Sequence, residues 1–197
     1  MKLVLASSNP GKLREIRGLL EPQGFEVVSQ QDFSIADADE PHPTFLENAL
    51  AKARHASRAS GMPALADDSG LCVEFLGGEP GVHSAYYAGQ GGSREERDAK
   101  NNQKLLSALG EERKAYYCCV LVMLRRPEDP RPLVAEGIWR GKIAHAPRGA
   151  NGFGYDPLFY LTDLGKTAAE LDLGHKNRIS HRSIALRKLL ELLNDPA

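Results

Sequence analysis

The sequence predicts an α/β fold with a mixed β-sheet, and two observations lead to this prediction. Strand-length apolar runs alternate with helix-period segments early in the chain, and two long β-rich runs follow each other later. Alternation favours parallel strands joined by helices, whereas two successive β-rich runs favour a hairpin. One α/β domain with both kinds of strand pairing is therefore expected.

The N-terminal part is predicted to run from strand to helix to strand. The apolar run at residues 2–6 has strand length, and SSNPGK then breaks it. Apolar residues between Leu13 and Leu20 recur at helical spacing. EVVS at residues 26–29 is a second strand, and the acidic, proline-containing segment at residues 32–43 is expected to be a surface loop.

A second helix is predicted from Thr44 to about Gly61. Thr44 and Glu47 have the spacing of a capping box, in which each residue satisfies an unpaired N–H at the helix start. The expected apolar face of this helix includes Phe45, Leu46 and Ala49.

The rest of the chain is predicted as strands, a helix, a hairpin and a last helix. Residues 63–78 are interpreted as two strands separated by a turn at Asp67–Gly70, because a polar tetrad ending in glycine is typical of turns. A polar helix follows at residues 93–109, and the hairpin spans residues 115–144. The last helix carries apolar residues at helical spacing behind Ser180, which is expected to be its N-cap.

Composition limits the functional classes that the chain can belong to. A formal net charge of −1, with 42% hydrophobic residues, fits one globular domain across residues 1–197 and gives no basic footprint for nucleic acid. The short apolar run at the start is too short for a signal peptide or a membrane span, so a cytoplasmic location is expected. Cys72, Cys118 and Cys119 are expected to be buried thiols in strands.

Residues 7–12 form the first segment whose residues suggest ligand binding. They lie where a strand passes into a helix, so unpaired helix N–H groups and the positive end of the dipole are available to a phosphate, and Lys12 adds a charge. The first glycine of a Walker A loop is absent. An ordinary turn with a solvated lysine remains the alternative.

Adjacent carboxylates form the second such segment. Asp67 and Asp68 repel one another unless a cation or hydrogen-bond donors compensate them, and Mg²⁺ typically takes one or two carboxylates together with phosphate oxygens and waters. Glu40 is a candidate second ligand. The alternative is a turn in which one aspartate caps the backbone and the other is solvated.

Two further segments, at residues 175–182 and 150–156, remain ambiguous on their own. The first places two histidines, a lysine and two arginines at the start of a helix, where the dipole favours an anion, although a solvated basic loop is the alternative. The second sets Phe153 and Tyr155 among glycines. Their rings either pack in the core or stack on a flat ligand.

Taken together, these segments resemble one family. The stretches SSNPGK, TFLENALAKA, ADDSGLCVEFLGGEPGVHSAYYAG, GFGYDPLF, GKTAAEL and ISHR follow in the order typical of the inosine/xanthosine triphosphate pyrophosphatases. The resemblance covers essentially the whole chain. It implies one domain of two lobes around a long, curved mixed β-sheet flanked by helices.

The resemblance also implies an activity and an assembly. It implies hydrolysis of noncanonical purine nucleoside triphosphates (dITP, ITP, XTP and dXTP) to the monophosphate and pyrophosphate, which removes them from the nucleotide pool. Mg²⁺ is the implied cofactor and a homodimer the implied assembly. No nucleic acid or membrane partner is implied.

Site residues follow from the same resemblance. Asp68 is implied as general base, and Glu40 and Asp68 as metal ligands. Ser69 is implied to touch the substrate, and residues 153–156 to bind the base. The substrate-binding residues implied are Ser7, Ser8, Asn9, Pro10, Gly11, Lys12, Ser69, Phe153, Gly154, Tyr155, Asp156, Lys176, His181 and Arg182.

Two rival functions stand beside this one. A nucleotide-sensing protein would need the same phosphate cradle without a base, and the presence of Asp68 and Glu40 argues against it. A pyrophosphatase for modified pyrimidine triphosphates is the other, and the SHR and FGYD segments favour purines instead.

Overall fold

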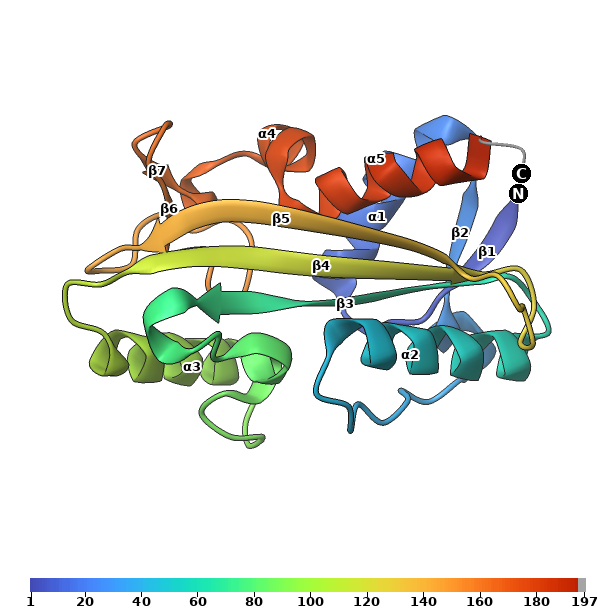
Figure 1. Ribbon diagram of the computed structural model, residues 1–197, viewed down its shortest axis with the longest axis horizontal. Helices are drawn as coiled ribbons and strands as arrows, with labels where there is room; N and C mark the ends of the chain where they lie inside the picture. Colours follow the sequence, from blue (N-terminus) through green and yellow to red (C-terminus); the bar gives the residue numbers. More distant parts are fainter. Residues whose placement is uncertain (195–197) are drawn as a thin grey trace. The chain divides into compact units, whose positions relative to one another are not determined.

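The computed structural model describes residues 1–194 and contains a seven-stranded sheet in the order β2-β1-β3-β4-β5-β6-β7 (Figure 1). The strands are β1 (Lys2–Leu5), β2 (Glu26–Ser29), β3 (Ala64–Val73), β4 (Lys114–Leu124), β5 (Leu133–Ile143), β6 (Phe159–Leu161) and β7 (Lys166–Thr167). The α-helices are α1 (Pro10–Leu20), α2 (Phe45–Ser60), α3 (Arg94–Ala108), α4 (Leu173–Ile179) and α5 (His181–Asn194). Short 3₁₀ helices are η1 (Glu21–Gln23), η2 (Gln30–Phe33), η3 (Glu74–Leu76), η4 (Gly81–Tyr86) and η5 (Ala168–Glu170).

Both kinds of strand pairing are present in the sheet. Strand β1 pairs in parallel with β2 and with β3, whereas β5 pairs antiparallel with β6 and β6 with β7. The parallel pairs belong to the alternating N-terminal part, because a helix connects β1 to β2 and another connects β2 to β3. The predicted mixed α/β fold is confirmed.

The chain forms two compact units. The first unit comprises Met1–Asp68, Cys119–Gly137 and residues 180–194; the second comprises Ser69–Cys118 and Ile138–Ile179. The chain passes from one unit to the other within β3, β4 and β5, and again between α4 and α5.

In the first unit, α1 and α5 pack together over one face of the strands. Ile16 of α1 and Leu186 of α5 share a buried cluster with Leu3 and Leu5 of β1. Side chains alternate along a strand, so the buried Val4 faces the opposite side, and that side also needs a cover. Figure 1 shows α2 on the side of the strands opposite α1 and α5.

In the second unit, a ring cluster forms the core. Tyr117 of β4 lies 4.7 Å from Phe159 between ring centroids, and Trp139 of β5 lies 5.2 Å from the same ring. Leu105 of α3 belongs to this cluster. The large aromatic area buried here gives the unit its own hydrophobic stabilisation.

The predicted ends of helix α2 are confirmed. The Thr44 hydroxyl oxygen accepts a hydrogen bond from the Glu47 N–H at 3.2 Å, and Gly61 ends the helix with a positive φ. The carboxylate of Glu47 accepts from the Thr44 hydroxyl at 2.6 Å. Leu46, expected on the apolar face, is 45% exposed, whereas Ala49 is fully buried.

The prediction of two strands around Asp67–Gly70 is wrong. Strand β3 continues through these residues from Ala64 to Val73. A buried carboxylate without a compensating charge is unfavourable, which is why the sequence favours a solvated turn for these two residues. In the structure, Lys12 and Arg182 pair with Asp67, and Lys52 pairs with Asp68. The compensated carboxylates can therefore remain within an extended strand.

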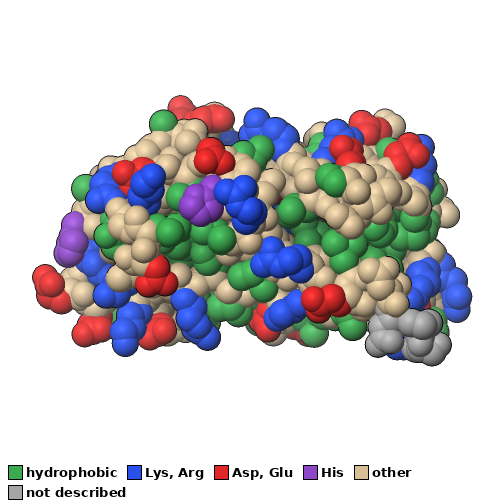
Figure 2. Space-filling model, turned by 90° about the horizontal axis from the view of Figure 1, so that it is seen from above, with side chains coloured by type: hydrophobic (Ala, Val, Ile, Leu, Met, Phe, Trp, Pro, Cys, Tyr) green, Lys and Arg blue, Asp and Glu red, His purple; other side chains and the backbone are tan. Residues whose placement is uncertain are grey.

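The remaining sequence predictions concern thiols, charge and membrane spans. Cys72 on β3 and Cys118 and Cys119 on β4 are buried thiols outside any disulfide, as predicted. On the face that Figure 2 shows, basic and acidic side chains are intermixed rather than segregated. Within residues 1–194, every helix falls short of the length and apolar character needed to cross a membrane.

Candidate functional site

The turn between β1 and α1 is organised by Asn9. Its side-chain oxygen accepts hydrogen bonds from the N–H groups of Gly11 at 2.9 Å and Lys12 at 3.2 Å, and Pro10 occupies the first helical position. The Ser7 hydroxyl accepts from the Asn9 N–H at 3.2 Å. Asn9 therefore already caps two of the N–H groups that the sequence offered to a phosphate.

Ser8 and Lys12 of the same turn are held by aspartates. The Ser8 hydroxyl donates to Asp37 at 2.6 Å. Lys12 Nζ lies 2.6 Å from Asp67 Oδ1, and its side chain is 15% exposed. Lys12 is thus a positioned, partly accessible charge rather than a freely solvated one.

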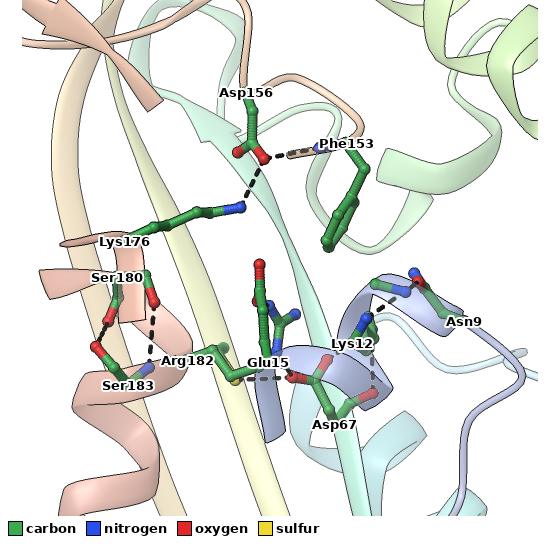
Figure 3. Close-up of polar contacts among 12 residues, drawn as sticks. Asn9, Lys12, Glu15, Asp67, Phe153, Asp156, Lys176, Ser180, Arg182 and Ser183 are labelled. Atoms are coloured by element: carbon green, nitrogen blue, oxygen red, sulfur yellow. Dashed lines mark hydrogen bonds and ion pairs between the residues drawn. The ribbon is translucent and has the colours of Figure 1, made fainter. Parts of the chain in front are cut away.

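Asp67 is the centre of a buried ion-pair network (Figure 3). Arg182 Nε donates to Asp67 Oδ2 at 2.7 Å, and the same guanidinium pairs with Glu15 of α1. Desolvation raises the pKa of Asp67, but the charges of Arg182 and Lys12 outweigh it and hold that pKa well below its usual value. Asp67 is therefore a permanent anion that fixes two cations.

This network compensates the positive charge of Arg182 at the start of α5. Arg182 lies in the first turn of α5, where the helix dipole disfavours a cation. The sequence suggested that an anionic ligand resolves the conflict. The protein itself supplies the anions, Glu15 and Asp67, and the Arg182 side chain is 1% exposed.

Asp68 has a different partner from the adjacent Asp67. Lys52 of α2 donates to Asp68 Oδ1 at 2.7 Å. Oδ2 of Asp68 is buried and has no hydrogen-bond partner among residues 1–194. Burial raises the pKa of Asp68 above its usual value, and the charges of Lys52 and Lys12 only partly oppose this. One carboxylate oxygen is thus fixed, and the other is left for a ligand or a water.

Glu40 and Asp68 both form ion pairs with Lys52. Lys52 Nζ lies 3.4 Å from Glu40 Oε1, and the Glu40 side chain is 45% exposed. Two carboxylates therefore converge on one positive charge, an arrangement that also suits a divalent cation. Within residues 1–194 no group of three or more His, Cys, Asp or Glu side chains could hold a metal ion, so phosphate or water oxygens would have to complete a coordination shell.

The second unit holds the predicted base-binding residues. Asp156 Oδ2 accepts from Lys176 Nζ at 2.6 Å and from the Phe153 N–H at 2.9 Å (Figure 3). The Asp156 and Lys176 side chains are 2% and 4% exposed. A buried acceptor and a buried donor thus lie side by side next to the Phe153 backbone.

The two aromatic residues of this loop have different environments. Tyr155 is 3% exposed, belongs to the core cluster and donates its hydroxyl to Ser84 O at 3.0 Å. Phe153 is half-buried and lies outside that cluster, with Arg94 and Lys176 within 4.9 Å of its ring centroid. The core interpretation therefore holds for Tyr155 and fails for Phe153.

The basic segment at residues 175–182 is structured rather than a solvated loop. Asp172 caps α4, which contains the buried Lys176. Ser180 caps α5 as predicted, because its hydroxyl oxygen accepts from the Ser183 N–H at 3.3 Å. His181 is 4% exposed, and Ser69 lies on β3 beside Asp68.

Sequence reasoning missed two charged residues of the first unit, Lys52 and Glu15. Lys52 lies on α2 and binds Asp68, while Glu15 lies on α1 and binds Arg182. A charged residue within a helical segment usually faces solvent, so nothing local in the sequence distinguishes either residue. One signal was present: Lys52 lies three residues after the apolar position Ala49, on the same helical face.

Comparison with known proteins places the chain in a family. A model of the Ham1 family matches residues 3–192. The chain belongs to the Ham1 family.

Other members of the Ham1 family are similar along nearly the whole chain. The dITP/XTP pyrophosphatases of Nitrosomonas europaea and Burkholderia pseudomallei are each 57% identical over 196 residues, which cover 98% of this chain and 95% and 94% of those proteins. A HAM1 protein structure from Coxiella burnetii matches with a TM-score of 0.90 and 46% identity over 100% of both chains. The Ham1 protein of Staphylococcus aureus matches with a TM-score of 0.84 and 39% identity over 98% of both chains.

Proposed function

We propose that this Ham1-family protein hydrolyses the noncanonical purine nucleoside triphosphates dITP, ITP, XTP and dXTP to the monophosphate and pyrophosphate. Relatives at 57% identity carry the name dITP/XTP pyrophosphatase, which bears out the activity predicted from the sequence. The observation that carries the proposal is the Asp68 carboxylate, with one oxygen fixed by Lys52 and the other buried without a partner. The reaction removes these nucleotides from the pool before they enter DNA or RNA.

Asp68 acts as the general base in this proposal. Hydrolysis within a triphosphate needs an in-line water and an acceptor for its proton. Lys52 fixes the carboxylate through Oδ1, so Oδ2 can accept the hydrogen bond of the attacking water. The raised pKa of Asp68 makes this carboxylate a better proton acceptor than a solvated aspartate.

A divalent cation, Mg²⁺, is proposed as the cofactor, with Glu40 and Asp68 as its protein ligands. Their convergence on Lys52 and the unpartnered Asp68 oxygen fit a site with few protein ligands. When bound, the ion would neutralise phosphate charge and lower the pKa of the attacking water.

The turn at residues 7–12 is proposed to bind the phosphates. Lys12 supplies a charge held in place by Asp67, and Asn9 fixes the backbone of the turn. Arg182 and His181 were expected to contact the substrate directly. Because the guanidinium of Arg182 is buried against Glu15 and Asp67, we assign it instead to holding Asp67, and through it Lys12.

The base is proposed to stack on Phe153 and to be read by Asp156 and Lys176. Hypoxanthine and xanthine offer a 6-oxo acceptor and an N1–H donor, which match the Lys176 ammonium and the Asp156 carboxylate. Adenine presents the reverse pattern. Since both side chains are buried, a mismatch leaves desolvated groups unpaired and can discriminate by roughly 10⁴.

A homodimer and a cytoplasmic location complete the proposal, with no nucleic acid or membrane partner. Sedimentation equilibrium tests the assembly directly: a mass of twice 21.5 kDa supports the dimer, and a mass of 21.5 kDa contradicts it.

Steady-state kinetics on a substrate panel tests the activity. With Mg²⁺ present, dITP and XTP should be hydrolysed with kcat/KM well above GTP, and ATP and the pyrimidine triphosphates should be lowest. Monophosphate and pyrophosphate should appear in equal amounts. Comparable kcat/KM for ATP and dITP would contradict the base readout, and release of orthophosphate in place of pyrophosphate would contradict the reaction.

A further inference from the structure

One face of helix α3 is directed at the loop that carries Phe153. Arg94, Asp98 and Asn102 are spaced four residues apart and therefore lie on one face of α3. The Arg94 guanidinium lies 4.8 Å from the Phe153 ring centroid. The first of these three residues, Arg94, therefore contacts the ring that is proposed to stack on the base.

Asp98 and Asn102 both bind the backbone of Gly154. The Gly154 N–H donates to Asp98 Oδ2 at 2.8 Å, and Asn102 Nδ2 donates to Gly154 O at 2.9 Å. The amide of Gly154 is therefore occupied and is not available to a base. Both peptide planes that flank Gly154 are fixed by side chains of a separate element.

The two hydrogen bonds hold a backbone conformation that only glycine adopts readily. Gly154 has φ of +64°, and a Cβ placed there would meet nothing within 4 Å. The glycine is thus required by its dihedral angle and not by crowding. A loop residue with this freedom needs outside contacts to stay in one conformation.

Asn102 contributes through its donor group. Its Oδ1 is buried and has no partner among the described residues, which is unfavourable. Turning the amide over would place that oxygen against the Gly154 carbonyl and lose the hydrogen bond of Nδ2. The bond to Gly154 is what this side chain adds to the loop.

The hydrogen bonds to Gly154, together with those of Asp156 to Phe153, set the backbone direction of Phe153. On the other side of Gly154, Tyr155 is anchored in the core through Ser84. The half-buried Phe153 ring has no such core anchor, because it lies outside the buried cluster. The Phe153 backbone is held on one side by Asp156, whose Oδ2 accepts from the Phe153 N–H and whose N–H donates to the Phe153 carbonyl at 3.3 Å. On the other side it is held by the peptide plane of Gly154, whose N–H donates to Asp98.

We propose that Asp98 and Asn102 are positioning residues for purine recognition, which hold Gly154 so that Phe153 presents its ring to the base. This inference rests on the proposed function and assigns α3 a part in base binding. The two residues act through Gly154 and do not touch the substrate.

The test separates binding of the base from binding of the phosphates. The KM and kcat for dITP are measured with Mg²⁺, alongside the inhibition constant of inorganic tripolyphosphate, which has no base. Asp98→Ala should raise the KM for dITP about tenfold, with kcat within about twofold, since one charge-assisted hydrogen bond is lost. The tripolyphosphate constant should stay within about twofold of the wild-type value.

Conservative variants distinguish positioning from a general structural role. Asp98→Asn keeps an oxygen that can accept from the Gly154 N–H and should stay within about threefold of the wild-type KM. Asn102→Asp keeps the shape but removes the donor and should raise the KM about tenfold or more. Gln103→Ala, an exposed position on the same helix, should change neither constant. Thermal unfolding of each variant shows that the comparison is made on folded protein.

Several outcomes overturn the inference. They are an unchanged KM in folded Asp98→Ala and Asn102→Asp, an equal rise in the KM for dITP and the tripolyphosphate constant, and Asp98→Asn as impaired as Asp98→Ala. If Asp98→Ala does not fold, Asp98→Asn and Asn102→Asp decide. Wild-type protein that fails to hydrolyse dITP and XTP refutes the proposed function instead.

Discussion

Lys52 Nζ lies 2.7 Å from Asp68 Oδ1, and the two side chains are 9% and 6% exposed. The contact joins the middle of α2 to β3, and Lys52 also lies 3.4 Å from Glu40. A carboxylate held in this way keeps its second oxygen in a defined direction. The pair therefore sets both the orientation of the proposed base and the electrostatic balance around it.

Replacing Asp68 by asparagine should stop the reaction while leaving binding intact. The amide keeps the size of the side chain but loses its basicity, so kcat for dITP should fall by about 10² to 10⁴. The dissociation constant for dITP, measured by calorimetry, should change far less. Asp163→Asn, at an exposed turn, serves as the control and should retain full kcat. A near-normal kcat in Asp68→Asn would reject the assignment of the base.

The Lys52–Asp68 pair should show strong thermodynamic coupling. Lys52→Met leaves a buried carboxylate without its cation and should lower the free energy of unfolding by about 3 kcal/mol. Adding Asp68→Asn removes that carboxylate's charge and should restore at least about 1 kcal/mol. Urea unfolding of the four proteins of the cycle gives the coupling energy.

The exposed pair Lys2–Glu26 is the matched control for that cycle. The charged atoms of this pair lie 2.8 Å apart, against 2.7 Å in the buried pair, but its side chains are 47% and 63% exposed. The coupling energy between Lys2→Met and Glu26→Gln should be below about 1 kcal/mol. Equal coupling energies in the two pairs would show that burial does not strengthen the Lys52–Asp68 contact.

Lys12→Ala should weaken catalysis without changing the preference among bases. The lysine is proposed to act on phosphate, which dITP and XTP share, so kcat/KM should fall for both by the same factor, about 10². The ratio of kcat/KM for dITP and XTP is the measurement. Lys2→Ala, at an exposed site, should leave both values unchanged. A tenfold shift in the ratio would place Lys12 near the base.

Gly152→Ala should disturb the base-reading carboxylate. A Cβ at Gly152 would collide with the Asp156 carboxylate, and the residue has φ of +78°. The methyl group should push Asp156 from Lys176 and raise the KM for dITP about tenfold. Gly165→Ala is the matched control, because Gly165 has a similar φ of +64° and its Cβ would meet only Tyr160 Oη, at 4.0 Å. Similar KM values for the two variants would contradict the collision.

Asp129 should give the protein a measurable dependence on acid pH. Partial burial raises the pKa of this carboxyl, but hydrogen bonds from the Arg125 and Arg131 N–H groups outweigh it and hold the pKa below its usual value. The stabilisation is therefore complete above the unfolded pKa of about 3.9 and is lost as pH falls through the lowered value. Asp129→Asn should lower the free energy of unfolding by about 1–2 kcal/mol at neutral pH.

The difference between Asp129→Asn and wild type should shrink below pH about 4, where the carboxyl of the unfolded chain becomes protonated, and vanish once the folded-state carboxyl is protonated at still lower pH. Urea unfolding across pH 3 to 7 measures it. Glu128→Gln makes the same charge change at an exposed position of the same loop and should show little effect. A difference that grows on acidification would contradict this account.

Local patterns were sufficient for most elements of the fold. The cap at Thr44, the glycine after Ser60 and the cap at Ser180 each depend on residues a few positions apart, so the sequence predicts these helix ends. The same local reasoning failed at β3. The pairing partners that keep Asp67 and Asp68 in a strand lie 16 or more residues away, on α1, α2 and α5.

The sequence by itself determined the α/β class, the family and the segments that carry chemistry, because short-range periodicity and motif order are written in consecutive residues. The tertiary structure alone decided that Asp67 is bound by Lys12 and Arg182 while Asp68 is bound by Lys52. It also decided that Arg182 pairs with Glu15. Neighbours on a strand point to opposite faces, and which charge meets each face depends on helices distant in the chain, so no local pattern contains the answer.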